Sequence, residues 1–111
     1  MSLFTWWKER RSIRGAGLSF YRRGMVRANQ HDHQGALEDY TAVIEMAGAP
    51  DDVRAMALYN RALLYAAVKD LPRAQSDLNA VLAMAAPLRK IKSAARQKLD
   101  RMQHGHDPEN V

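Results

Sequence analysis

Apolar residues recur at three- and four-residue spacing along most of this chain, which is the pattern of helices that bury one face. The spacing runs through residues 20–28, 36–47, 58–66 and 74–85. A polar turn separates the first stretch from the second, and another separates the third from the fourth. The pattern therefore predicts an all-α protein whose helices come in consecutive pairs.

The residues at the turns fit the same reading. Asp32 and Asp70 each stand just before the second helix of a pair. A carboxylate there can accept hydrogen bonds from the free N–H groups of the first helical turn. Pro72 falls in that first turn, where its missing N–H costs nothing. Residues 47–52 end the first pair and lead into the second.

The two predicted hairpins repeat each other with a period of 38 residues. Residues 20–47 match residues 58–85 at ten positions, where ordinary composition gives roughly two or three by chance. Small residues recur where two antiparallel helices must approach closely, and Tyr40 or Leu78 fills the space one turn further on. These small positions are Gly24 and Ala62 in the first helices and Ala36 and Ala74 in the second.

Residues 88–103 predict one more helix, which closes the array. Six Lys and Arg residues cover most of its surface, and a single narrow apolar stripe runs along it, formed by Ile91, Ala95, Leu99 and Met102. A terminal helix with one apolar edge and a charged outer face keeps a helical array soluble. We expect residues 104–111 to form a disordered tail.

The chain resembles the tetratricopeptide-repeat (TPR) family over about residues 17–87. The pattern is Phe20-x-x-Arg23-Gly24 and Ala36-x-x-x-Tyr40, then Leu58-x-x-Arg61-Ala62-x-x-Tyr65, Ala74-x-x-x-Leu78 and a closing Pro87. Ala62 and Leu78 replace the commoner glycine and aromatic residue, and the period exceeds the usual 34 or so residues. The resemblance implies a short right-handed α-solenoid of two TPR-like repeats, residues 17–50 and 52–87, plus the capping helix.

The resemblance also implies a function, because the first helix of each pair lines a concave groove in such arrays. The implied groove residues are Leu18, Tyr21, Arg22, Met25, Met56, Tyr59, Asn60 and Leu63. This apolar, aromatic and methionine-bearing surface suits a partner's amphipathic helix or extended apolar peptide. We therefore expect a non-catalytic scaffold or adaptor that binds a protein or peptide and needs no cofactor.

The N-terminal segment, residues 1–16, is aromatic and basic and reads as a short helix or a flexible stretch. Phe4, Trp6 and Trp7 are too apolar to leave in water. They could fold back over the first repeat, or insert into the groove of a second copy. The second reading makes a self-associating homodimer the alternative function. A third reading is weak contact with a membrane surface, because tryptophan beside basic residues resembles an interfacial anchor.

Charge and composition narrow the remaining classes. The net charge is +5, but it comes from basic ends that flank an acidic middle, whereas a nucleic-acid reader more often shows one continuous basic face. We therefore rank nucleic-acid binding below protein binding. The chain has no cysteine, no apolar run long enough to span a membrane and no signal-peptide pattern at its start. Cytoplasm is the expected compartment.

No residue pattern predicts catalysis or a metal site. Serines and threonines show no nucleophile–base spacing, and the histidines near positions 31–33 and 104–106 read as a solvated turn and a tail. Four acidic residues of the second helices are spaced like a solvated face: Glu38, Asp39, Glu45 and Asp77. We therefore expect the chain not to be an enzyme.

Overall fold

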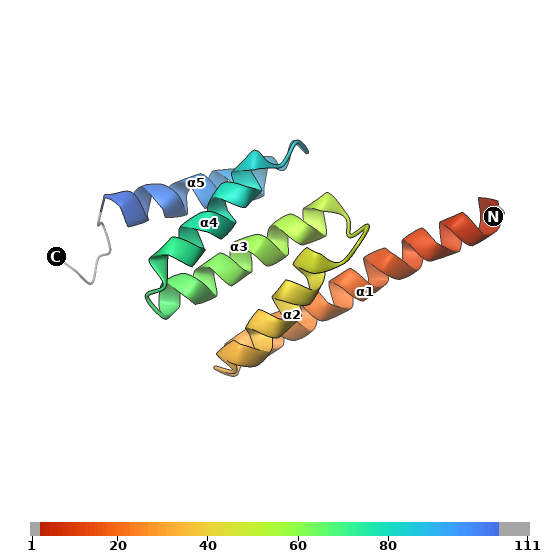
Figure 1. Cartoon of the computed structure of the whole chain (residues 1–111), viewed down its shortest axis with the longest axis horizontal. Helices are drawn as coiled ribbons and strands as arrows, with labels where there is room; N and C mark the ends of the chain where they lie inside the picture. Colours follow the sequence, from red (N-terminus) through yellow and green to blue (C-terminus); the bar gives the residue numbers. More distant parts are fainter. Residues whose placement is uncertain (1–2, 105–111) are drawn as a thin grey trace. The chain divides into compact units, whose positions relative to one another are not determined.

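The computed structural model describes the backbone of residues 3–104 and the side chains of residues 12–104. Within that stretch the chain forms five helices and no strand, which confirms the all-α prediction (Figure 1). The helices are α1 (Leu3–Asn29), α2 (His33–Glu45), α3 (Asp51–Ala67), α4 (Leu71–Ala83) and α5 (Arg89–Gln103). None of these described helices is long and apolar enough to cross a membrane. The chain divides into two compact units, residues 1–57 and 58–111, whose boundary lies within α3.

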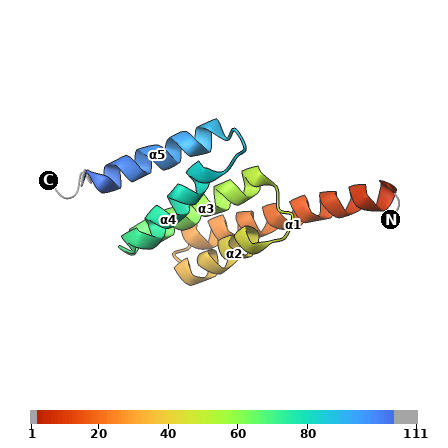
Figure 2. The same cartoon turned by 45° about the horizontal axis from the view of Figure 1, so that its top comes forward.

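In the first unit, α1 and α2 lie side by side and run in opposite directions (Figures 1 and 2). The chain reverses at His31, whose φ of 62° lies in the left-handed region. The backbone N–H of Asp32 donates to the carbonyl of Arg27 at 2.8 Å. The Asp32 carboxylate then accepts a hydrogen bond from the N–H of Gly35 at 3.0 Å. The predicted cap at Asp32 is confirmed.

The second unit contains the same turn between α3 and α4. Lys69 has a φ of 66°, and the N–H of Asp70 donates to the carbonyl of Tyr65 at 2.8 Å. The Asp70 carboxylate accepts from the N–H of Arg73 at 3.3 Å, which confirms the second predicted cap. Pro72 lies in the first turn of α4, as expected. Identical backbone geometry at residues 38 apart shows that the sequence repeat is also a repeat of local structure.

Part of the core lies at positions that the helical spacing predicts, whereas Ala47 and Ala85, at the ends of the predicted stretches, are exposed. In the first unit, Tyr40 is 1% exposed and Val43 is fully buried. In the second unit, Leu78 and Val81 are fully buried at the equivalent positions. The buried small residues on the facing helices are Gly24, Ala36, Ala62 and Ala74. In each helical hairpin, therefore, small and large residues are buried together between the two helices.

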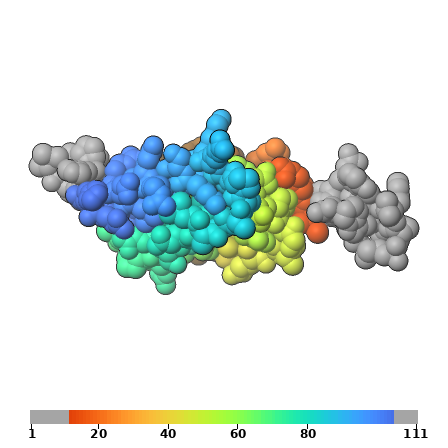
Figure 3. All heavy atoms as spheres, turned by 90° about the horizontal axis from the view of Figure 1, so that it is seen from above, coloured from red at the N-terminus to blue at the C-terminus, as the bar shows by residue number. Residues whose placement is uncertain are grey.

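Helix α5 packs against α4 in the second unit (Figure 3). Ala95 and Leu99 are buried, whereas Ile91 and Met102 are half-buried, so the predicted stripe forms its inner edge. Lys92 Nζ donates a hydrogen bond to the backbone carbonyl of Met84, at the end of α4. This bond satisfies a helix-terminal carbonyl that α4 leaves without an internal partner.

The N-terminal segment differs from one expectation. Helix α1 runs without interruption from Leu3 to Asn29, so residues 3–16 continue the first helix of the hairpin. The reading in which this segment folds back over the first repeat is therefore wrong. Gly15 and Gly17 lower helix propensity without breaking the helix, and no proline interrupts it. The side chains of Phe4, Trp6 and Trp7 lie outside the described residues.

Candidate interaction surface

An ion pair between an arginine and a buried aspartate recurs in both units and joins the two helices of each hairpin. In the first unit, Arg23 Nε and Nη2 donate to the two carboxylate oxygens of Asp39 at 3.0 and 2.7 Å. In the second, Arg61 makes the same two bonds to Asp77 at 2.8 and 2.7 Å. A two-pronged bond between a planar guanidinium and a carboxylate fixes orientation as well as distance. It therefore sets the rotation of the first helix against the second.

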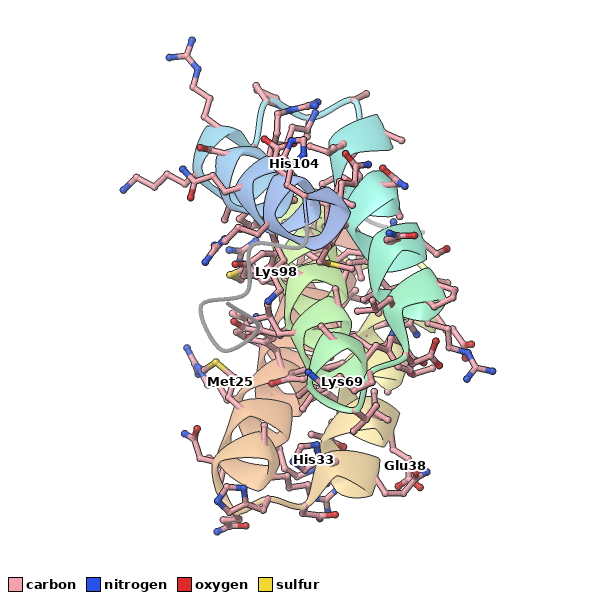
Figure 4. The ribbon with its side chains drawn as sticks, turned by 90° about the vertical axis from the view of Figure 1, so that its left-hand side faces the viewer. Met25, His33, Glu38, Lys69, Lys98 and His104 are labelled. Atoms are coloured by element: carbon pink, nitrogen blue, oxygen red, sulfur yellow. The ribbon has the colours of Figure 1, made fainter. Side chains whose placement is uncertain are left out.

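These aspartates correct an expectation from the sequence. Asp39 is 2% exposed and Asp77 is 5% exposed, so they do not belong to a solvated face. Glu38 and Glu45 are exposed, as predicted, and Figure 4 shows Glu38 pointing outward from α2. The signal that could have found the ion pair was already present, because the repeat aligns Arg23 with Arg61 and Asp39 with Asp77. Identity of a charged residue and its partner at both repeats indicates a shared contact.

The first unit adds a second cation to its buried carboxylate. Arg27 Nη1 lies 3.2 Å from Asp39 Oδ2. The repeat places Tyr65 at the position of Arg27, and Arg61 instead lies over the Tyr65 ring, 5.7 Å from its centre. The guanidinium of Arg73 approaches the same ring at 5.9 Å. Arg27 thus gives Asp39 a partner for which Asp77 has no equivalent at the matching position.

On α1, the predicted groove residues follow one another along one side of the helix. Leu18 and Tyr21 are half-buried, whereas Arg22 is exposed and Met25 is 37% exposed. Figure 4 shows Met25 on the side of α1 away from α2. The spacing of three and four residues gives these side chains a common face. This part of the predicted surface is accessible to a partner.

Tyr21 also contacts the core. Its ring centre lies 6.0 Å from that of Tyr40, with the ring planes tilted by 41°. Burial, with smaller contributions from the nearby Tyr21 and Asp39, raises the pKa of Tyr40 to about 12. Tyr21 therefore supports the hairpin as well as lining the predicted surface.

On α3, the other four predicted groove residues are half-buried. They are Met56, Tyr59, Asn60 and Leu63. They recur at three- and four-residue spacing and so share one face of α3. The prediction that they complete a single groove with the residues of α1 stays a prediction.

Within the first unit, Arg14 joins α1 to the first turn of α3. Its Nη1 and Nη2 atoms lie 3.2 and 2.9 Å from the carboxylate oxygens of Asp52. The hydrogen bond from Arg14 holds the pKa of Asp52 below its usual range. No sequence pattern predicts this pair, because it depends on how two helices cross. Both side chains are about half-exposed, so the pair adds little stability.

The turn histidines form a stacked pair. The ring centres of His31 and His33 lie 6.4 Å apart with nearly parallel planes, and Asp32 between them is occupied as a helix cap. Among residues with described side chains, no three His, Asp or Glu residues converge as a metal site would require.

No family model, curated protein or solved structure matches this chain. The candidate surface therefore rests on the residues described above.

A further open depression of about 420 Å³ lies beside α5 in the second unit. Its lining mixes both charges with one apolar side chain: Leu82, Lys92, Ser93, Arg96, Gln97 and Asp100. Sites for small organic ligands are usually enclosed and mostly apolar. This depression is open, and five of its six lining residues carry a polar or charged group.

Proposed function

We propose that this chain is a non-catalytic protein-interaction module of the tetratricopeptide type, which binds a peptide or helix of a partner protein. One observation carries the proposal: contacts that define a helical hairpin recur at residues 38 apart. The recurring set comprises the aspartate cap, the left-handed residue before it and the Arg–Asp pair. A repeat of sequence and of contacts together supports an array of equivalent hairpins, that is, a short right-handed α-solenoid.

The surface offered to the partner is the side of the first helices that carries the predicted groove residues. It combines accessible apolar groups such as Met25 with a cation, Arg22. Methionine adapts its shape to a bound apolar side chain, and aromatic residues supply a large contact area. The chemistry suits an amphipathic helix or an extended peptide with apolar anchors.

The test is affinity capture from the native cell with the tagged full chain, followed by direct titration of the captured partner. We expect Met25→Asp and Leu63→Asp each to weaken partner binding by about ten-fold or more, because each places a charge at an apolar contact. Val68→Asp is the matched control, since Val68 is 56% exposed and lies outside the predicted surface. Circular dichroism checks that helicity is unchanged in all three variants.

Binding that is unchanged in both Met25→Asp and Leu63→Asp would remove this surface from consideration. Light scattering tests the alternative function. A concentration-independent mass of 12.5 kDa counts against self-association, whereas a stable dimer would favour it.

A further inference from the structure

The 38-residue equivalence extends to α5. Helix α3 begins at Asp51 and α5 begins at Arg89, which is 38 residues later. Arg54 Nη2 donates to the carbonyl of Met46 at 3.2 Å, and Lys92 makes the corresponding bond to Met84. Each cation caps the end of the preceding helix. Helix α5 therefore begins where the first helix of a third repeat would begin, and the 38-residue offset allows α1, α3 and α5 to be compared position by position.

One row of side chains along these helices is largely buried in α3 but exposed to solvent in α1. In α3 the row includes Val53 and Ala57, both fully buried, and Leu64, which is 8% exposed. The α5 equivalent of Ala57 is Ala95, which is also fully buried. In α1 all four members are exposed: Gly15, Ser19, Arg22 and Val26. We refer to these four residues as the α1 stripe.

The spacing of the α1 stripe, four then three then four residues, is that of a helix–helix seam. Val26 is 54% exposed, although its equivalent Leu64 is buried. A Cβ atom on Gly15 would meet no other atom within 4 Å, so the backbone there is open to close approach. The small residues Gly15 and Ser19 allow another helix to approach α1 closely, and Val26 provides an apolar contact for that helix.

The positive charge of α1 indicates which kind of helix binds the α1 stripe. Helix α1 carries seven Lys and Arg residues and a single acidic residue, and three of the seven cations, Arg14, Arg23 and Arg27, pair with Asp52 or Asp39. Arg22 lies within the stripe and forms no ion pair with the side chains that the structure describes. A second copy of α1 would bring the same strong positive charge and would be repelled. A helix with carboxylates beside an apolar seam is attracted instead.

We propose that the α1 stripe is a second docking surface, which adjoins the predicted groove, shares Arg22 with it and binds an acidic amphipathic helix of a partner protein. An apolar side chain of that helix packs on Val26, and a carboxylate pairs with Arg22. The bound helix covers α1 along the stripe that is already buried in α3.

The test uses the full chain and two synthetic amphipathic peptides of about 18 residues, long enough for five helical turns. One peptide has a leucine seam flanked by glutamates, and its control has lysines in place of the glutamates. We expect the acidic peptide to bind about ten-fold or more tightly than the basic one. Raising NaCl from about 50 to about 500 mM should weaken that binding, because salt screens exposed charges.

Variants then locate the site. Val26→Asp should weaken binding of the acidic peptide by about ten-fold or more, because it adds a like charge to the apolar contact. Ser19→Trp should also weaken binding of the acidic peptide, because a large side chain at this position prevents the peptide helix from approaching α1 closely. Val68→Asp and Leu63→Asp should leave binding within about two-fold of the unchanged chain. Leu63→Asp also distinguishes this site from the groove, because Leu63 belongs only to the groove. If the groove proposal failed, the prediction for the α1 stripe would still stand.

Loss of peptide binding in Val26→Asp and Ser19→Trp, with retention in the two controls, supports the second docking surface. The proposal would be overturned by no binding of the acidic peptide, by equal binding in Val26→Asp, by Val26-dependent dimers in sedimentation, or by retention only on vesicles of phosphatidylcholine and phosphatidylglycerol. Binding of a single-stranded oligonucleotide in preference to the acidic peptide would overturn it as well.

Discussion

Gly24 of α1 faces the ring of Tyr40 of α2 so closely that a Cβ atom at Gly24 would lie 2.6 Å from Tyr40 Cε1. In the second unit the equivalent residues are Ala62 and Leu78, which are 1% and 0% exposed. A methyl group is thus present where the opposing side chain is aliphatic, and absent where it is an aromatic ring. The two departures from the usual repeat pattern, at Ala62 and Leu78, are one coupled change.

This coupling makes Gly24→Ala informative. Alanine favours a helix over glycine by about 1 kcal/mol, but forcing a methyl group into a packed core costs about 1–3 kcal/mol. Because the Tyr40 ring is 1% exposed and packed in the core, we expect the steric cost to exceed the gain in helix propensity, with a net loss of about 1 kcal/mol in the free energy of unfolding. Urea denaturation measures it.

The double variant Gly24→Ala/Tyr40→Leu provides the control, because it installs the Ala62–Leu78 combination in the first unit. Its loss of stability should be smaller than the sum of the two single losses. A Gly24→Ala variant that is more stable than the unchanged chain would show that the ring yields and that helix propensity decides.

The two Arg–Asp pairs predict unequal effects of matched substitutions. Arg61→Gln leaves the buried carboxylate of Asp77 without its guanidinium, and we expect the free energy of unfolding to fall by about 2 kcal/mol. Arg23→Gln should cost less, because Arg27 remains 3.2 Å from Asp39. Urea denaturation of the two variants provides the comparison. Equal losses would show that Arg27 does not compensate.

Tyr40 predicts a loss of stability at high pH. Its pKa in the folded chain is raised from 10.0 to about 12, so the unfolded chain releases this proton first. The neutral phenol stabilises the fold fully below pH 10, and this contribution is lost as the pH rises from about 10 to about 12. The full effect is of order 2 kcal/mol.

Absorbance near 295 nm follows the ionisation of the tyrosines, and denaturation at each pH follows stability. Tyr40→Phe should remove the steepest part of the loss between pH 10 and 12. If both titration and stability are the same in Tyr40→Phe, then another tyrosine is responsible.

Asp52 predicts an opposite and smaller dependence at acid pH. Because Arg14 holds the pKa of Asp52 below its ordinary value of 3.8, the ionised carboxylate stabilises the fold above that pH. The contribution disappears as the pH falls below it and the carboxylate is protonated. Asp52→Asn should therefore differ from the unchanged chain near pH 7 and match it near pH 2. High salt should also abolish the difference, since the pair is exposed.

Much of the fold followed from the sequence, because local rules decided it. The helical spacing, the caps at Asp32 and Asp70 and the apolar edge of α5 depend on neighbouring residues, and all are confirmed. The eight groove residues were placed by resemblance. The structure gives their exposure on α1 and α3, whereas their joint role stays a prediction.

Helical spacing did not separate buried from exposed polar residues, and the tertiary structure decided which of them lie inside. Asp39 has the same helical spacing as an exposed acid, and its burial depends on the approach of Arg23 from the facing helix. Similarly, sequence indicated that position 24 must be small, but the distance to the Tyr40 ring explains why it is glycine and not alanine. Periodicity along one helix records which faces are apolar. It carries no information about the rotation and separation of two helices, and these determine which charges meet and how much room a methyl group has.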